Sequence, residues 1–209
     1  MKKCVIFGAA PIEDYSFVDV SCADMIICAD AGVRHAKALK IEPDLVLGDF
    51  DSCDKSETED YVRKSFPVRK DDTDLMLAVK YALKSECDDF VIYGALGGRL
   101  DHTLASITAL NFLADNNKTA CLCDSKHTVK ILAQGKHKIK NNGGYLSLFP
   151  YGCEKAQINL QGTAYDGDAI LTASFPLGVS NEIVNDEATV TVFSDKDETR
   201  VLMVLSQKN

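Results

Sequence analysis

The residues with the clearest chemical potential are two aspartates, Asp49 and Asp51, which follow a short apolar run over residues 45–47. If this run is a β-strand, side chains two positions apart leave the same face, so both carboxylates stand side by side beyond its end. Carboxylates this close repel each other by about 1 kcal/mol in water and ~4 kcal/mol near a protein surface. A hard divalent cation relieves that repulsion, and Mg²⁺ commonly joins one or two carboxylates to substrate phosphates. The spacing therefore indicates a Mg²⁺ site, with capping of a following helix by Asp51 or Ser52 as the alternative.

Acidic residues also follow the other apolar runs that the sequence predicts to be strands of the same sheet. They are Asp30, Asp71, Asp72, Asp74 and Asp101. In open α/β sheets, ligands bind in the crevice beyond the carboxyl ends of the strands, so these residues belong to one edge. Helix capping accounts for any single one of them, but it does not require acids at four successive strand ends. The pattern favours an acidic binding site at that edge.

A glycine-rich segment precedes Asp101 and adds a fixed positive charge to the same edge. Gly94, Gly97 and Gly98 permit positive φ angles and a close approach of the backbone to a ligand. Arg99 can meet phosphate oxygens in a forked geometry. The segment matches neither the P-loop nor the dinucleotide-binding fingerprint. The residues alone thus indicate a Mg²⁺-dependent site for a phosphorylated ligand.

Two kinds of periodicity divide the chain into the elements that must position these residues. Up to residue 124, apolar runs alternate with helical patterns, which is typical of βαβ units and a mostly parallel sheet. Strands are predicted there over 4–7, 25–29, 45–47, 66–69, 90–93 and 119–123, and helices over 32–39, 54–64, 73–83 and 100–113. Short alternating runs separated by turns follow, over 129–132, 145–149, 156–160, 188–193 and 201–205. We therefore expect an α/β catalytic domain over 1–124 and an all-β sandwich domain over 125–209.

The composition of the chain excludes several classes of binding partner and indicates its cellular location. The chain has 209 residues, a net charge of −8 and 46% hydrophobic residues. This charge argues against nucleic acid or a membrane surface as an electrostatically bound partner. No stretch approaches the roughly 20 apolar residues of a membrane span, and the eight cysteines lack zinc-site spacing. We expect a cytoplasmic protein with reduced thiols.

Taken together, these motifs resemble those of the thiamine pyrophosphokinase family. The resemblance runs in order through residues 29–32, 48–52, 70–74 and 94–102, and it resumes at 178–182 in the predicted β-domain. It implies an enzyme that moves a pyrophosphoryl group from ATP to the hydroxyl of thiamine, giving thiamine diphosphate and AMP. It also implies Mg²⁺ as cofactor and a homodimer whose active sites lie between subunits.

The resemblance further implies roles for individual residues. Asp49, Asp51 and Asp74 would hold Mg²⁺. Asp30 and Asp101 would lie close to the reacting groups, and the sequence does not decide which of them accepts the hydroxyl proton. The expected nucleotide contacts are Arg99, Gly97, Gly98, Asp71 and Thr73, and the expected thiamine contacts in the β-domain are Ser180 and Asn181.

Two other functions remain open at this point. One is a Mg²⁺-dependent phosphatase, because Asp49-Phe50-Asp51 resembles the Asp-x-Asp motif of aspartyl-phosphate hydrolases. In that family the motif lies on the first strand, not the third, and a Thr or Val stands two residues after its second aspartate, where this chain has Cys53. The other is a non-enzymatic thiamine or nucleotide sensor, which would not need a complete set of metal-binding acids.

Overall fold

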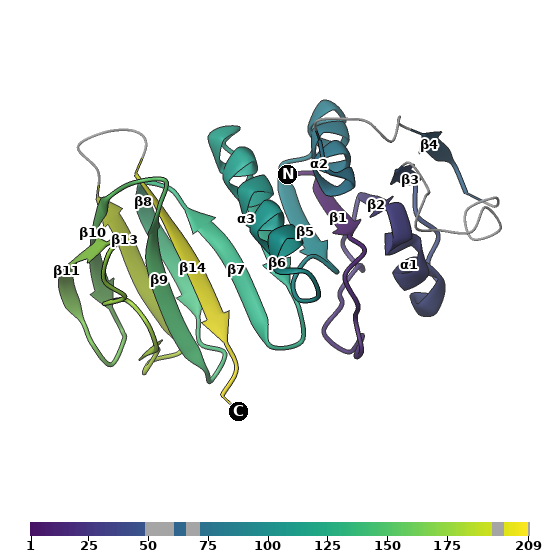
Figure 1. Ribbon diagram of the computed structural model, residues 1–209. Helices are drawn as coiled ribbons and strands as arrows, with labels where there is room; N and C mark the ends of the chain where they lie inside the picture. The colour runs from purple at the N-terminus through teal and green to yellow at the C-terminus, as the bar shows by residue number, and fades with distance from the viewer. Residues whose placement is uncertain (49–60, 66–71, 194–198, 209) are drawn as a thin grey trace. The chain divides into compact units, whose positions relative to one another are not determined.

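The chain forms two compact units, Met1–Ser125 and Lys126–Asn209, in a computed structural model (Figure 1). The structure describes residues 1–48, 61–65, 72–193 and 199–208. No helix in these ranges is both long and apolar enough to cross a membrane.

A parallel sheet forms the centre of the first unit. Its strand order is β6-β5-β1-β2-β3-β4, and every neighbouring pair runs parallel. The strands are β1 (Lys3–Phe7), β2 (Met25–Ala29), β3 (Leu45–Gly48), β4 (Arg63–Ser65), β5 (Asp89–Tyr93) and β6 (Thr119–Cys123). Consecutive residues of β1, from Cys4 to Phe7, have no exposed surface, so this strand is covered on both faces. Such burial is typical of a parallel sheet between helices.

Helices cover this sheet and connect its strands. They are the short 3-10 helix η1 (Asp30–Gly32) and the α-helices α1 (Val33–Leu39), α2 (Asp74–Lys84) and α3 (Leu100–Asp115). Val33 and Ala36 of α1 pack against Val5 and Phe7 of β1. Helix α2 contacts β1, β2 and β3, while α3 contacts β6. The prediction of an α/β domain is confirmed.

The direction of winding reverses at β1, which positions the binding crevice. From β1 the chain proceeds outward through β2, β3 and β4 on one side, and then returns to place β5 and β6 on the other. In open α/β sheets, ligands bind at such a switch point, beyond the carboxyl ends of the strands. The crevice is therefore expected where β1 and β5 end, at Phe7 and Tyr93.

One predicted helix is partly wrong. The pattern over 54–64 predicts a helix, yet Arg63 and Lys64 lie in β4, where Val46 pairs with Arg63 and Leu47 with Lys64. Pairing with the edge of β3 overrides the local helical propensity of these residues. The strand predicted over 66–69 lies outside the described residues.

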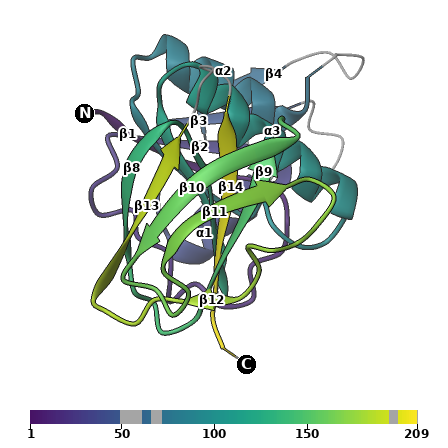
Figure 2. The ribbon, with the colours of Figure 1, turned by 90° about the vertical axis from the view of Figure 1, so that its left-hand side faces the viewer.

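The second unit consists of antiparallel strands, as the sequence predicts. One sheet has the order β12-β9-β14-β7 and the other β11-β10-β13-β8, and Figure 2 shows β10, β11 and β13 side by side. The strands are β7 (His127–Leu132), β8 (Gly135–Lys140), β9 (Tyr145–Tyr151), β10 (Lys155–Gln161), β11 (Gly167–Thr172), β12 (Asn181–Glu182), β13 (Glu187–Phe193) and β14 (Arg200–Ser206). Alternate residues of β10 and β13 are buried in a common apolar core, which includes Ile158 and Val190.

Candidate active site

A cavity of about 610 Å³ lies at the switch point of the first unit. Its wall contains the segment after β1 (residues 8–11), the end of β2 with Asp30, the start of α2 (residues 72–75) and the turn after β5. Segments far apart in sequence meet here because parallel strands deliver their carboxyl ends to one edge.

Asp30 is the most deeply placed acid of this wall. It is 7% exposed and adopts a φ of +48°, which is uncommon for a residue other than glycine. Such conformations cost free energy and are concentrated at functional sites. A Cβ added to Gly48 would lie only 3.2 Å from the Cα of Asp30, so the end of β3 lies directly against it. Asp49 and Asp51 follow Gly48 in the chain and lie outside the described residues, as does Asp71.

The start of α2 brings further predicted residues to the cavity. Thr73 is the N-cap of this helix, and its hydroxyl accepts a hydrogen bond from the backbone N–H of Met76 at 3.2 Å. Asp72 forms an ion pair with Lys80 at 2.7 Å. Asp74 occupies the first turn of the helix and lines the cavity. Thr73 and Asp72 thus have structural roles at the start of α2, and Asp74 also contributes a carboxylate to the wall.

Two glycine turns form another part of the wall. Gly94 has a φ of +62°, and a Cβ at this position would meet the carbonyl oxygen of Gly8 at 2.6 Å. The N–H of Gly8 donates to the Tyr93 carbonyl at 2.8 Å, and the N–H of Ala10 donates to the Gly94 carbonyl at 2.8 Å. The turns after β1 and β5 therefore pack backbone against backbone. The prediction of site residues included Gly97 and Gly98 but missed residues 8–11, although Gly8 at the end of the first strand was an available signal.

Arg99 and Asp101 form an ion pair at the start of α3. The Arg99 Nε and a terminal guanidinium nitrogen donate to the two Asp101 carboxylate oxygens, at 3.1 and 2.6 Å. This pairing lowers the pKa of Asp101 and raises the pKa of Arg99. Both side chains are largely exposed, at 71% and 64%. Arg99 lines the cavity and Asp101 is not among the lining residues, so the two carboxylates proposed near the reacting groups, Asp30 and Asp101, differ in position.

The donor chemistry of the wall fits a hard cation such as Mg²⁺. Asp30 and Asp74 bring carboxylate oxygens to one cavity, and such oxygens are the ligands that Mg²⁺ prefers. Within the part of the chain that the structure describes, no three acidic, histidine or cysteine side chains are arranged as a metal site. Two of the three predicted ligands, Asp49 and Asp51, lie outside that part.

In the second unit, Ser180 and Asn181 are the two residues that the family resemblance predicts to contact thiamine. Asn181 is 8% exposed, and its amide is fully engaged: the oxygen accepts from the N–H of Tyr165 and Glu182, and the nitrogen donates to Thr163 and Tyr165. Ser180 is exposed and has a φ of +61°. The side chain of Asn181 therefore holds the local backbone in place, and Ser180 lies exposed beside it.

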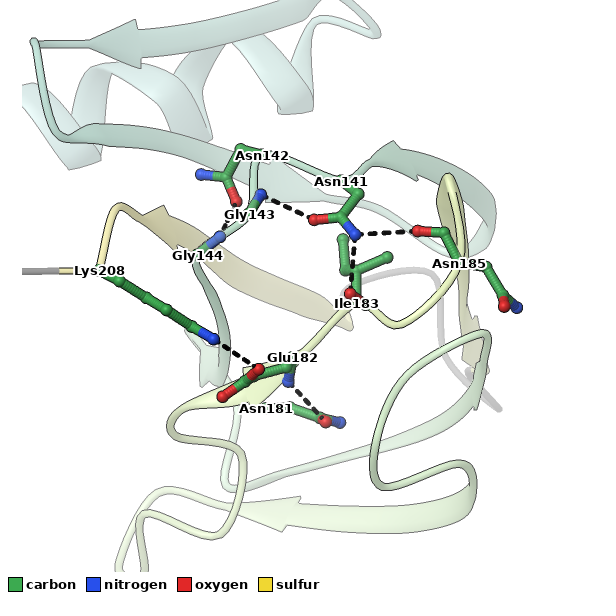
Figure 3. A network of polar contacts seen from close by, with 9 residues as sticks. All are labelled: Asn141, Asn142, Gly143, Gly144, Asn181, Glu182, Ile183, Asn185 and Lys208. Atoms are coloured by element: carbon green, nitrogen blue, oxygen red, sulfur yellow. Dashed lines mark hydrogen bonds and ion pairs between the residues drawn. The ribbon is translucent and has the colours of Figure 1, made fainter.

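The residues after Asn181 are fastened to a neighbouring turn. Figure 3 shows the Asn141 amide nitrogen donating to the carbonyls of Ile183 and Asn185, at 2.8 and 2.9 Å. Lys208 forms an ion pair with Glu182 at 2.8 Å. These contacts give the segment 181–185 a fixed path.

The fold and the cavity define an α/β protein with an acidic, glycine-lined cavity at the switch point of a parallel sheet, followed in the chain by a unit of antiparallel strands. Residues 20–122 match the family model described as "Thiamin pyrophosphokinase, catalytic domain", and residues 128–197 match "Thiamin pyrophosphokinase, vitamin B1 binding domain". The chain belongs to the thiamine pyrophosphokinase family. The known reaction of this family transfers a pyrophosphoryl group from ATP to thiamine.

Individual relatives agree with this assignment. The thiamine pyrophosphokinase of Bacillus subtilis is 30% identical over 169 residues, which cover 77% of this chain and 75% of the relative. Thiamine pyrophosphokinase 3 of Oryza sativa is 28% identical over 206 residues, covering 84% and 77% of the two chains. The crystal structure of the Bacillus subtilis thiamine pyrophosphokinase superimposes over the full length of both chains with a TM-score of 0.86 at 26% identity.

Proposed function

We propose that this chain is a Mg²⁺-dependent enzyme that transfers the pyrophosphoryl group of ATP to the hydroxyl of thiamine, releasing AMP. The observation that carries the proposal is the cavity at the β1/β5 switch point, whose wall combines Asp30, Asp74 and Arg99 with glycine turns. Membership of the family and the match to a vitamin B1 binding domain supply the substrates.

The triphosphate of ATP binds against the turn after β5. Gly97 and Gly98 have φ angles of +80° and +64°, and a Cβ at Gly97 would meet no atom within 4 Å. Side-chain-free backbone of this kind lets phosphate oxygens approach the N–H groups at the start of α3, where the helix dipole favours negative charge. Arg99 leaves Asp101 and adds a forked donor to these oxygens.

Carboxylates on the facing wall hold the metal and receive the proton. Asp74, together with Asp49 and Asp51, would hold Mg²⁺. When bound, this ion would supply positive charge that neutralises phosphate oxygens. We assign acceptance of the thiamine hydroxyl proton to Asp30, because it is buried in the cavity wall whereas Asp101 is exposed outside it. Alignment and charge neutralisation, rather than a covalent intermediate, provide the rate enhancement.

The proposal also covers the thiamine-binding residues and the oligomeric state of the enzyme. Ser180 contacts thiamine, and Asn181 positions Ser180 because its side-chain amide oxygen accepts hydrogen bonds from the backbone N–H groups of Tyr165 and Glu182. The active enzyme is a cytoplasmic homodimer in which each active site combines residues of both subunits.

Product analysis decides between this function and its alternatives. The protein is incubated with ATP, Mg²⁺ and thiamine, and nucleotides and thiamine esters are separated by chromatography. Equal amounts of AMP and thiamine diphosphate are expected, and formation should stop when Mg²⁺ is chelated. ADP or free phosphate as the main product would indicate another transferase or a phosphatase, and saturable binding without turnover would indicate a sensor.

A further inference from the structure

His35 lies buried behind the wall of the active-site cavity, although it does not line the cavity itself. It belongs to α1 and is 6% exposed. Its ring packs against Phe7 and Tyr15, with centroids 6.2 and 5.8 Å away. A Cβ at Gly94 would lie 3.1 Å from its Nε2 atom, so the ring directly supports the turn after β5.

Both ring nitrogens of His35 have partners, and these partners determine the tautomer. Nε2 lies 3.0 Å from the carbonyl oxygen of Ala10, which only accepts hydrogen bonds, so Nε2 carries the proton. Nδ1 lies 2.8 Å from the hydroxyl of Tyr15 and accepts a hydrogen bond from it. A single neutral imidazole therefore links α1 to two points of the segment after β1.

The surroundings favour this neutral form. Burial lowers the pKa of His35, and the positive charge of neighbouring Arg34 lowers it further. Backbone carbonyls of Ala10 and Gly8 oppose this shift but do not reverse it. The neutral ring keeps a donor for the Ala10 carbonyl and an acceptor for the Tyr15 hydroxyl.

We propose that His35 is a positioning residue for nucleotide binding: it fixes the turn after β1 against the turn after β5. The Ala10 carbonyl accepts from His35, while the Ala10 N–H donates to the Gly94 carbonyl at 2.8 Å. Loss of the imidazole leaves the Ala10 carbonyl without its donor and removes the support beneath Gly94, so the two turns are held less firmly against each other. This inference rests on the proposed function because it assumes that the turns after β1 and β5 face the phosphates of ATP.

Two substitutions separate positioning from packing. His35→Gln places an amide donor where Nε2 stands and retains the contact with Ala10, whereas His35→Leu fills space without any donor. We expect His35→Leu to raise the KM for ATP by about tenfold or more, and His35→Gln to stay within about threefold of the wild type. The KM for thiamine should change by less than about twofold in both variants. Tyr15→Phe is the matched control, because it removes only the hydrogen bond to Nδ1.

A second readout does not depend on turnover. In His35→Leu, the Ala10 amide should exchange with solvent at least about tenfold faster than in the wild type, with protection restored in His35→Gln. The nitrogen NMR shifts of wild-type His35 should report a proton on Nε2. If His35→Leu has a lower melting temperature but keeps the wild-type KM for ATP and the wild-type exchange of Ala10, the residue only packs and the inference is overturned. If the wild-type enzyme forms no AMP while the exchange result holds, the proposed function fails and the linkage of the two turns stands.

Discussion

Arg99 forms two hydrogen bonds with Asp101 in the absence of a ligand, and both side chains are exposed to water. Exposed ion pairs are weak because water screens them, so a phosphate can replace the Asp101 carboxylate at little cost. We predict that Asp101→Asn lowers the KM for ATP or leaves it unchanged, while Arg99→Ala raises it by about tenfold or more.

Arg99→Lys distinguishes a forked contact from a simple charge. Lysine keeps the positive charge but loses the planar pair of donors, so this variant should recover only part of the affinity for ATP. Steady-state kinetics at saturating thiamine provide the comparison between Arg99→Lys and the wild type.

The assignment of the proton acceptor to Asp30 is tested by comparing Asp30→Asn with Asp101→Asn. A loss of turnover in Asp101→Asn as large as in Asp30→Asn would contradict this assignment.

His35 makes stability depend on pH. Its folded pKa lies below the usual value of about 6.5, so the unfolded chain binds the proton more readily than the folded one. The stabilisation is complete above pH ~6.5 and is lost as the pH falls through the lower folded pKa. We therefore expect the melting temperature of the wild type to fall more steeply than that of His35→Gln between pH 7 and pH 5. Equal dependence of the melting temperature on pH in the two proteins would show that His35 has the same pKa in the folded and unfolded states. The groups near the ring are Tyr15, Arg34 and the carbonyls of Gly8 and Ala10.

At the scale of the element, the active site depends on the close packing of the turns after β1 and β5. Gly94 combines a positive φ with a Cβ position 2.6 Å from the carbonyl oxygen of Gly8. Gly94→Ala should therefore cost more than about 2 kcal/mol and lower the melting temperature by roughly 4 °C or more. Gly97→Ala is the matched control, because its φ is also positive but its Cβ would meet no neighbour. Equal losses in both variants would show that backbone strain alone, and not contact between the turns, is responsible.

The elements that carry strong periodicity were predictable from the sequence. The strand predicted over 25–29 coincides with β2, and the helices predicted over 73–83 and 100–113 differ from α2 and α3 by at most two residues at either end. The helix predicted over 54–64 is wrong at Arg63 and Lys64, because their pairing with β3 is a tertiary effect that local helical propensity does not report. β12, with only two residues, is too short to produce a pattern.

The candidate site was predictable to the extent that it lies at strand ends. Asp30, Asp74 and Arg99 meet in one cavity, as the rule for parallel sheets predicts. The sequence did not predict a role for His35, because an isolated histidine on a short helix has no spacing that identifies its partners. Its role depends on the distance to Ala10, which only folding determines.

At the scale of the whole molecule, the proposed dimer makes a prediction about mixed subunits. If each active site takes its metal-binding acids from one subunit and its thiamine contact from the other, two inactive variants can complement each other. Asp74→Asn and Ser180→Arg should each be inactive, and an exchanged mixture should regain about a quarter of the wild-type activity, since half of the dimers then contain one intact site. Analytical ultracentrifugation should show a dimer for all three samples. An exchanged mixture as inactive as its components would place both sets of residues in one subunit.

The transfer of an intact pyrophosphoryl group is tested most directly with ATP that carries a label in its β-phosphorus. With thiamine and Mg²⁺ present, the label should appear in thiamine diphosphate, the AMP should be unlabelled, and Asp74→Asn should reduce the transfer by more than about 100-fold with an unchanged circular dichroism spectrum. Label retained in ADP, or a near-normal rate in Asp74→Asn at saturating Mg²⁺, would contradict a metal-assisted attack on the β-phosphorus at this acidic cavity.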